Sequence, residues 1–155
     1  MSSRASIAMS EAEVLAFLEQ ERTLTCASAG SDGWPHLMPL WYVLRGGRIW
    51  AWTYAKSQKV RNLERDPRAT LLVETGTEYT ELRGVQIEAE AELVRDPERV
   101  AEFGVELTVR YAEGISSVEG DARAALEAQA PKRVAISFPV LRMATWDHRK
   151  LGGTY

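Results

Sequence analysis

The stretch from Val85 to Leu93 constrains the fold most, because apolar and polar side chains alternate through it without interruption. A period of two places successive side chains on opposite faces of a β-strand. One face would carry only Val85, Ile87, Ala89, Ala91 and Leu93, and the other only Gln86, Glu88, Glu90 and Glu92. A strand with one solvated face is typical of an antiparallel sheet.

Five further segments rich in β-forming residues are predicted strands. They cover residues 23–29, 35–44, 48–54, 69–74 and 133–146, the last interrupted near Pro139. Six strands that follow one another mostly in hairpins favour a mainly β fold, a closed antiparallel barrel. A parallel sheet would need alternating β–α units, which the sequence lacks.

Helices are expected singly between the strands. Residues 10–13 form a capping box that starts a helix ending near residue 21. Asp96 and Pro97 are a typical N-cap and first helical residue. The other predicted helices cover residues 58–65, 97–111 and 122–129. We expect one domain over residues 1–155, with residues 1–9 flexible.

Composition restricts the class of protein. The net charge is −3, with 45% hydrophobic and 26% charged residues, which disfavours a general nucleic-acid or membrane-surface binder. There is no apolar run of about 18 residues, and the N-terminal segment lacks a signal-peptide core. Cys26 is the single cysteine, which suits a reducing cytoplasm. No His/Cys/Asp cluster has metal-ligand spacing, so no metal site is predicted.

The hairpin joined by Gly46-Gly47 is unusually aromatic. Pairing Leu44 with Arg48 would place Tyr42 opposite Trp50, with aromatic side chains on both faces of the hairpin. Large aromatic residues are usually core or interface residues. Because both faces cannot belong to one core, we expect one of them to meet another subunit or a ligand.

A cationic helix start follows the aromatic strand directly. Ser57 is a good N-cap, flanked by Lys56 and Lys59, and the unpaired N–H groups of a helix start favour anions. Asn62 lies on the same helix face as Lys59. The segment is interpreted as a phosphate site beside an aromatic wall; a merely solvated helix start is the alternative.

No nucleophile, acid and base with known catalytic spacing is present, and no Walker-type loop or Gly-x-Ser-x-Gly motif. The catalytic residues therefore remain unassigned. Solvent or a tyrosine such as Tyr79 could supply a proton. If the protein is an enzyme, a cofactor is expected to carry the chemistry.

The segment from Lys56 to Arg68 (Lys-Ser-Gln-Lys-Val-Arg-Asn-Leu-Glu-Arg-Asp-Pro-Arg), followed by Arg83-Gly84-Val85 and the alternating strand, resembles the pyridoxamine-phosphate-oxidase-like split barrels. Within them it is similar to the flavin/deazaflavin oxidoreductases, B group. The resemblance covers roughly residues 10–146. It implies a six-stranded split β-barrel that forms a homodimer, with the cofactor in a groove at the subunit interface.

The resemblance also implies residue roles. The segment Met38, Pro39, Leu40 and Trp41 would line the isoalloxazine-type ring, and Trp52 and Thr53 would close over it. Lys56, Ser57 and especially Lys59 would hold the phosphate, with Asn62 close behind.

Two departures from the flavin-mononucleotide (FMN) oxidases bear on the cofactor. The FMN oxidases carry Arg-Lys where this chain has Gln58-Lys59, and they carry a basic residue near the position of Trp41. A terminal phosphate dianion favours several charge-assisted bonds. The smaller cationic set favours the deazaflavin coenzyme F-420 (an 8-hydroxy-5-deazaflavin), whose phosphate is a diester with one charge.

The expected function is that of an oxidoreductase that uses coenzyme F-420 to transfer a hydride to an unsaturated organic acceptor. Alternatives are an FMN-dependent oxidoreductase of the same fold, and a non-enzymatic flavin, haem or tetrapyrrole binder. The basic residues that hold pyridoxal phosphate in the oxidases have no clear match after Trp146. Arg149 and Lys150 either reach a neighbouring subunit's site or form an ordinary polar terminus.

Overall fold

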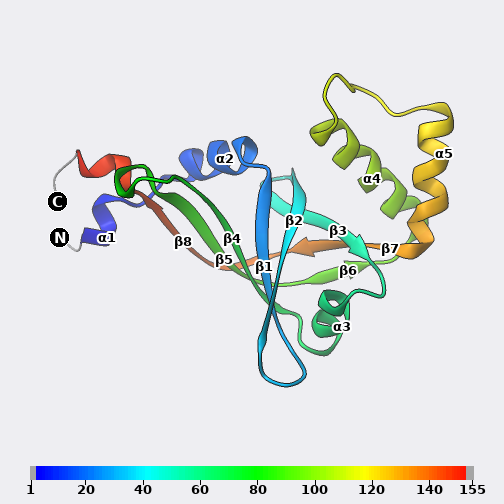
Figure 1. Ribbon diagram of the computed structural model, residues 1–155, viewed down its shortest axis with the longest axis horizontal. Coiled ribbons are helices and arrows are strands. Elements are labelled where there is room, and N and C mark those ends of the chain that lie inside the picture. Colours follow the sequence, from blue (N-terminus) through cyan, green and yellow to red (C-terminus); the bar gives the residue numbers. More distant parts are fainter. Residues whose placement is uncertain (1–2, 153–155) are drawn as a thin grey trace.

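A computed structural model describes residues 3–152, and its centre is a strongly curved antiparallel sheet (Figure 1). The strands lie in the order β6-β7-β3-β2-β1-β4-β5-β8. Their bounds are β1 Thr23–Ala29, β2 Pro35–Arg45, β3 Arg48–Tyr54, β4 Arg68–Thr75, β5 Arg83–Glu90, β6 Glu92–Val94, β7 Arg133–Phe138 and β8 Val140–Asp147.

The eight strands arise from the six predicted ones, because the last two are each interrupted once. Ala91 separates β5 from β6, and its N–H leaves the ladder to donate to the Pro67 carbonyl at 2.7 Å. Pro139, which has no N–H to give, separates β7 from β8. The β5–β8 ladder, with an irregularity after Glu88, continues in the β6–β7 ladder. Since β7 also pairs with β3 and β5 with β4, the sheet closes into a split barrel, as predicted.

Helices occupy the ends and one outer face of the sheet. Ser10 and Asp96 cap α2 and α4 as predicted, accepting hydrogen bonds from the N–H groups of Glu13 and Arg99. The α-helices are α1 Ser3–Ser6, α2 Glu11–Gln20, α3 Gln58–Arg65, α4 Pro97–Tyr111 and α5 Gly120–Gln129. Short 3-10 turns are η1 Tyr79–Glu81, η2 Ala130–Lys132 and η3 His148–Leu151. None of these helices is long and apolar enough to span a membrane.

The predicted register of the β2–β3 hairpin is wrong by one residue. Arg45, not Leu44, pairs with Arg48, so Tyr42 lies opposite Ala51. The reason is the turn: Gly46 and Gly47 have φ of +57° and +76°, a conformation that closes a two-residue hairpin and that glycine adopts without strain.

The barrel interior is the larger of two cores. Side chains such as Leu24, Tyr42, Leu71 and Ile136 are fully buried there, and α2 closes one end with Phe17 and Leu18. The Tyr42 hydroxyl donates to the Leu18 carbonyl at 2.6 Å, and burial raises the pKa of this phenol.

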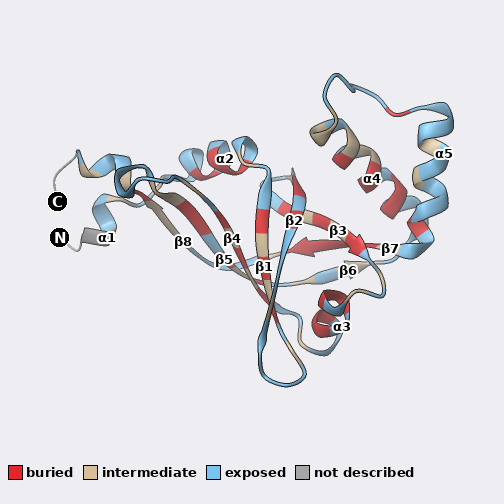
Figure 2. Cartoon of the chain, in the orientation of Figure 1, coloured by how far each residue is buried: buried red, intermediate tan, exposed pale blue. Residues whose placement is uncertain are grey.

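A second core lies outside the barrel, where α4 and α5 cover the face of β3 and β7 (Figures 1 and 2). Phe103 packs against Trp50, with ring centroids 6.1 Å apart. Both faces of the hairpin are apolar, as predicted. Helices of the same chain pack on part of one face, and the expectation that one face meets another subunit or a ligand stays a prediction.

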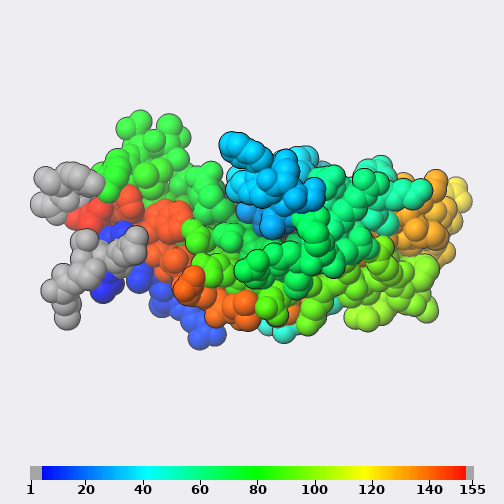
Figure 3. All heavy atoms as spheres, turned by 90° about the horizontal axis from the view of Figure 1, so that it is seen from below, coloured from blue at the N-terminus to red at the C-terminus, as the bar shows by residue number. Residues whose placement is uncertain are grey.

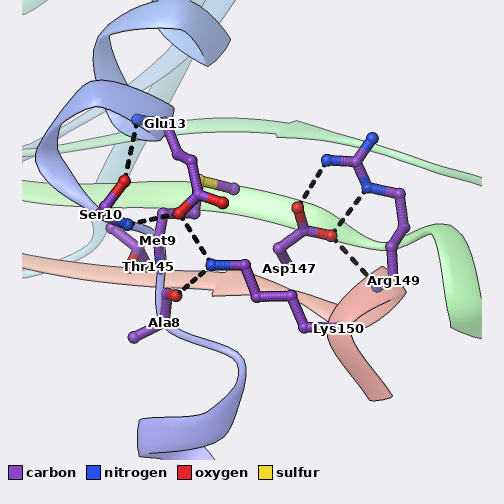
Figure 4. Close-up of polar contacts among 8 residues, drawn as sticks. All are labelled: Ala8, Met9, Ser10, Glu13, Thr145, Asp147, Arg149 and Lys150. Atoms are coloured by element: carbon purple, nitrogen blue, oxygen red, sulfur yellow. Dashed lines mark hydrogen bonds and ion pairs between the residues drawn. The ribbon is translucent and has the colours of Figure 1, made fainter. Parts of the chain in front are cut away.

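The two ends of the described chain are joined by polar contacts (Figure 4). Lys150 Nζ lies 2.7 Å from Glu13 Oε2 and donates to the Ala8 carbonyl at 2.7 Å. Arg149 forms a two-bond ion pair with Asp147. Both cations expected to reach a neighbour, or to be an ordinary polar terminus, thus have partners in their own chain. Residues 3–9, expected to be flexible, include α1 and a hydrogen bond from Met9 N–H to Thr145; residues 1 and 2 lie outside the described part.

The Glu13 contacts predict a pH-dependent stability. The hydrogen bond from Lys150, followed by those from Ser10, lowers the pKa of Glu13 from 4.5 to about 2. A carboxylate with a depressed folded-state pKa stabilises the fold above its unfolded-state pKa, and this contribution is lost as pH falls from 4.5 toward 2. The stability difference between the wild type and Glu13→Gln should therefore shrink between about pH 6 and about pH 3 in urea unfolding.

Glu11→Gln is the matched control, because it removes a charge from the same helical turn without touching Lys150. A wild-type advantage over Glu13→Gln that stays constant with pH would contradict the assignment.

Candidate functional site

A cavity of about 650 Å³ lies between the sheet and the helices α4 and α5. Its volume is typical of small-molecule sites. Four of the predicted ring-lining residues, Pro39, Leu40, Trp41 and Trp52, line it together. The remaining lining residues are Thr23, Gly104, Leu107, Thr108, Tyr111, Ala112, Leu126 and Arg133.

Tyr111 fixes one aromatic wall of this cavity. Its ring stacks on Trp41 with centroids 4.5 Å apart and planes 8° from parallel. The Tyr111 hydroxyl bridges to the backbone of Tyr42 and to the Arg22 carbonyl, at 2.7–3.0 Å. The phenol therefore anchors the end of α4 to the sheet and holds the half-exposed indole of Trp41 at the cavity.

The second wall depends on a helical glycine. An added Cβ at Gly104 would lie 2.3 Å from Cζ3 of Trp52, far inside contact distance. Glycine is unfavourable in a helix interior by about 1 kcal/mol relative to alanine. Its presence in α4 is therefore explained by the close approach of the Trp52 ring.

Among residues 3–152, Arg133 is the single ionic side chain that lines the cavity. Its guanidinium lies 4.9 Å from the ring centroid of Trp52 and 3.7 Å from that of Tyr54. Its Nε is buried without a hydrogen-bond partner, and Nη2 has one long contact to Gln129, at 3.4 Å. Pairing of Tyr54 with Arg133 across β3 and β7 brings these residues together.

The predicted phosphate residues lie around the start of α3. Ser57 caps the helix as predicted, accepting from the Val60 N–H at 3.4 Å. Lys56 is exposed, whereas the side chain of Lys59 turns inward and is only 4% exposed. Lys59 Nζ donates to Thr53 Oγ1 at 3.2 Å. The two lysines therefore occupy different environments.

Lys59 lies beside Cys26 inside the barrel. Burial lowers the pKa of the Lys59 ammonium, and the neighbouring thiol opposes this weakly. Burial raises the pKa of Cys26 to about 11, with the Lys59 charge acting in the other direction. A thiol with this pKa stays protonated at neutral pH, so Cys26 is a small buried side chain and not a nucleophile.

Asn62 secures α3 to the barrel. It is fully buried, donates from Nδ2 to Ser28 Oγ at 3.1 Å and accepts from Gln58 Nε2 at 2.9 Å. The Asn62 side-chain amide therefore links α3 to strand β1 through these two hydrogen bonds.

The structure thus divides the predicted site between the two faces of β3. Trp52 faces the cavity under α4, and Thr53, the next residue, faces the barrel and Lys59. Met38 does not line the cavity and lies exposed on the hairpin of β1 and β2. This hairpin projects from the body of the molecule in Figure 1 and points toward the viewer in Figure 3. Tyr79 contacts His148 near the described C-terminal end and does not line the cavity.

Sequence reasoning missed the contribution of α4, α5 and Arg133. The helix from Pro97 to Tyr111 was predictable, but its docking face was not. Arg133 reaches Trp52 only because β3 pairs with β7, about 80 residues further along the chain. No local pattern in the sequence signals that contact.

Comparisons with known proteins agree with this fold. The family model described as Pyridoxamine 5'-phosphate oxidase matches residues 10–147. The conserved hypothetical protein Rv2991 from Mycobacterium tuberculosis is 42% identical, with a TM-score of 0.89 over 100% of this chain and 95% of that one. No curated protein matches this chain.

Two more distant crystal structures share the fold. An F420 reductase is 22% identical, with a TM-score of 0.64 over 83% of this chain and 94% of its own. The heme storage protein HutZ from Vibrio cholerae is 17% identical, with a TM-score of 0.67 over 87% and 94%. At these identities the likeness extends to the fold alone.

The contact between Gly104 and Trp52 can be tested by overpacking. Gly104→Ala should lower the free energy of unfolding, because overpacking costs about 1–3 kcal/mol and alanine's helix propensity returns only about 1 kcal/mol. Adding Trp52→Phe supplies a smaller ring and should make the alanine neutral or stabilising. Urea unfolding followed by circular dichroism measures both; an alanine that stabilises both backgrounds equally would show that the ring does not limit the site.

Proposed function

The chain belongs to the pyridoxamine 5'-phosphate oxidase family, and from that premise we propose that it is an oxidoreductase that uses the deazaflavin coenzyme F-420 to transfer a hydride to an unsaturated organic acceptor. When bound, the reduced deazaflavin would supply a hydride, and solvent would supply the proton that completes reduction of the acceptor. The residues of the chain bind, orient and shield the reactants.

The observation that carries the proposal is the environment of Lys59. Its ammonium group is enclosed beside the start of α3, with one hydrogen bond to Thr53 and no ion pair to a carboxylate within residues 3–152. An unpaired buried cation is costly. A phosphate at the helix start would offset this cost through the ammonium group and the free N–H groups of the first turn.

The cavity supports the ring assignment. Trp41, Trp52, Pro39 and Leu40 offer apolar and aromatic surface for a flat ring system. The Ala55 N–H donates to the Lys132 carbonyl at 3.0 Å, so the start of α3 lies beside the start of β7. A ligand with its ring in the cavity and its phosphate at α3 would pass around the C-terminal end of β3.

The choice of deazaflavin over FMN rests on charge. The Gln58 amide donates to Asn62, and Trp41 stacks on Tyr111, so neither position supplies the cation found in the FMN oxidases. Lys56 and Lys59 are the lysines at this helix start. Two cations suit the single charge of a diester better than a terminal phosphate dianion.

We also propose a homodimer with the cofactor at its interface. The projecting hairpin exposes Trp34, Leu37 and Met38, and β8 exposes Leu141 and Met143. Exposed apolar patches of this kind mark interaction surfaces, and two-fold symmetry is the commonest way to bury them. A lone, protonated Cys26 further supports a cytoplasmic location.

The cofactor proposal is tested by titrating the protein with coenzyme F-420 and with FMN, followed by fluorescence. Lys59→Met should weaken F-420 binding by about 1.5–3 kcal/mol, the range for a hydrogen bond to a charged group. Arg61→Met is the matched control, because it removes an exposed charge from the same helix.

If Lys59→Met bound F-420 as tightly as the wild type, the assignment of Lys59 to the phosphate would be wrong. Preference of the wild type for FMN would contradict the charge argument. Binding of neither compound, together with binding of haem, would replace the oxidoreductase with a tetrapyrrole binder.

The dimer is tested by light scattering at micromolar concentration. Leu141→Asp should convert the protein to monomers, because an unpaired charge in an apolar interface is costly. Val109→Asp alters an exposed apolar residue of α4, away from the hairpin and β8, and should leave the dimer intact. A monomeric wild type would contradict the proposed interface site.

A further inference from the structure

The cavity under α4 and α5 combines an apolar lining with one fixed cation. Leu40, Leu107, Leu126 and the rings of Trp41 and Trp52 are among the apolar groups that line it. The Thr108 hydroxyl donates to the Gly104 carbonyl of the same helix at 2.9 Å, so its hydrogen is already used within α4. No aspartate or glutamate lines the cavity, which leaves the charge of Arg133 uncompensated there.

Arg133 differs in this respect from seven other arginines of the described chain. Those seven each form an ion pair with a carboxylate: Arg45, Arg48, Arg68, Arg95, Arg123, Arg142 and Arg149. Arg133 forms none within residues 3–152, and its buried Nε has no partner. Arg110 shares both features, but its Nη2 donates to three backbone carbonyls, whereas Arg133 has one long contact to Gln129. A buried donor without a partner carries an uncompensated desolvation cost.

Stacking holds the guanidinium ready for an anion. Trp52 and Tyr54 lie against it at 4.9 and 3.7 Å, which fixes its position while leaving its N–H edge for hydrogen bonds. A planar guanidinium can bind a carboxylate with two parallel hydrogen bonds. The adjoining indole ring of Trp52 offers a flat apolar surface to whatever carries that carboxylate.

We propose that this cavity binds the acceptor of the reaction, and that the acceptor is a planar, conjugated carboxylate whose anionic group pairs with Arg133. The conjugated part lies against the Trp52 ring next to Arg133 and leaves Pro39, Leu40 and Trp41 to the cofactor ring, and the carboxylate replaces the missing partner of the guanidinium. Arg133 is then the residue that selects anionic over neutral acceptors. That the bound carboxylate is the hydride acceptor rests on the proposed function. The preference of the cavity for a conjugated carboxylate does not.

The test uses two probes that differ only in charge, 4-fluorocinnamate and 4-fluorocinnamamide, with binding followed by fluorine NMR. The wild type should bind the carboxylate at least about tenfold more tightly than the amide, as expected for hydrogen bonds between charged groups. Arg133→Met should abolish this preference and leave the affinity for the amide within about twofold. Arg123→Met removes an arginine of α5 that pairs with Glu127 and does not line the cavity, and it should behave as the wild type.

A second variant locates the probes. Leu126→Trp reduces the space in the cavity and should weaken both probes alike, whereas Arg133→Met weakens only the anion. Equal affinity of the wild type for the two probes, or a preference that survives Arg133→Met, would overturn the proposal. If Leu126→Trp did not change the affinity for 4-fluorocinnamate, the probe would bind outside the cavity, and this result would also overturn the proposal.

A titration with coenzyme F-420 separates the acceptor from the cofactor as the source of the anion. If Arg133 holds the acceptor, Arg133→Met changes the affinity for F-420 by less than about threefold, and the two ligands bind together. Loss of F-420 binding in Arg133→Met, with 4-fluorocinnamate displaced by F-420 from the wild type, would assign Arg133 to the cofactor and overturn the proposal. Failure of F-420 to bind any variant would contradict the proposed function and leave the probe preference standing.

Discussion

The pairing of β3 with β7 is the constraint on which the candidate site depends. Its register places Tyr54 opposite Arg133 and Trp52 opposite Ala135. Through this pairing the guanidinium reaches the Trp52 ring, and the Lys132 carbonyl accepts from the N–H of Ala55. A shift of one residue would move every side chain of β3 to the opposite face. The cavity and the cationic helix start would then no longer adjoin at the C-terminal end of β3.

The alternation of β3 explains how one short strand serves two environments. Trp50 and Trp52 point outward to α4, whereas Ala51 and Thr53 point into the barrel. The aromatic wall and the buried Lys59 are therefore neighbours in sequence on opposite sides of a sheet. They meet only where β3 ends and α3 begins, which makes the C-terminal end of β3 the natural path for a ligand with a ring and a charged tail.

Local chemistry made much of the fold predictable. The caps at Ser10, Ser57 and Asp96 and the alternation after Val85 follow from rules that act within a few residues. The hairpin register was mispredicted because positive φ at both glycines decides it. The docking of α4 and the place of Arg133 depend on contacts between distant segments. The sequence therefore pointed to candidate residues on β2, β3 and α3 and carried no local signal for the cavity residues on α4, α5 and β7.

Among the described residues, Lys59 and Arg133 lie near the candidate site without carboxylate partners, and their environments differ. The guanidinium of Arg133 is stabilised in part by the rings of Trp52 and Tyr54, which lie against it. Lys59 has no such ring, and burial lowers its pKa instead. An anion that binds beside Lys59 raises the pKa of its ammonium group again. At a pH where Lys59 is a neutral amine in the free protein, anion binding is therefore accompanied by the uptake of a proton. This coupling of anion binding to proton uptake follows from the burial of the Lys59 side chain.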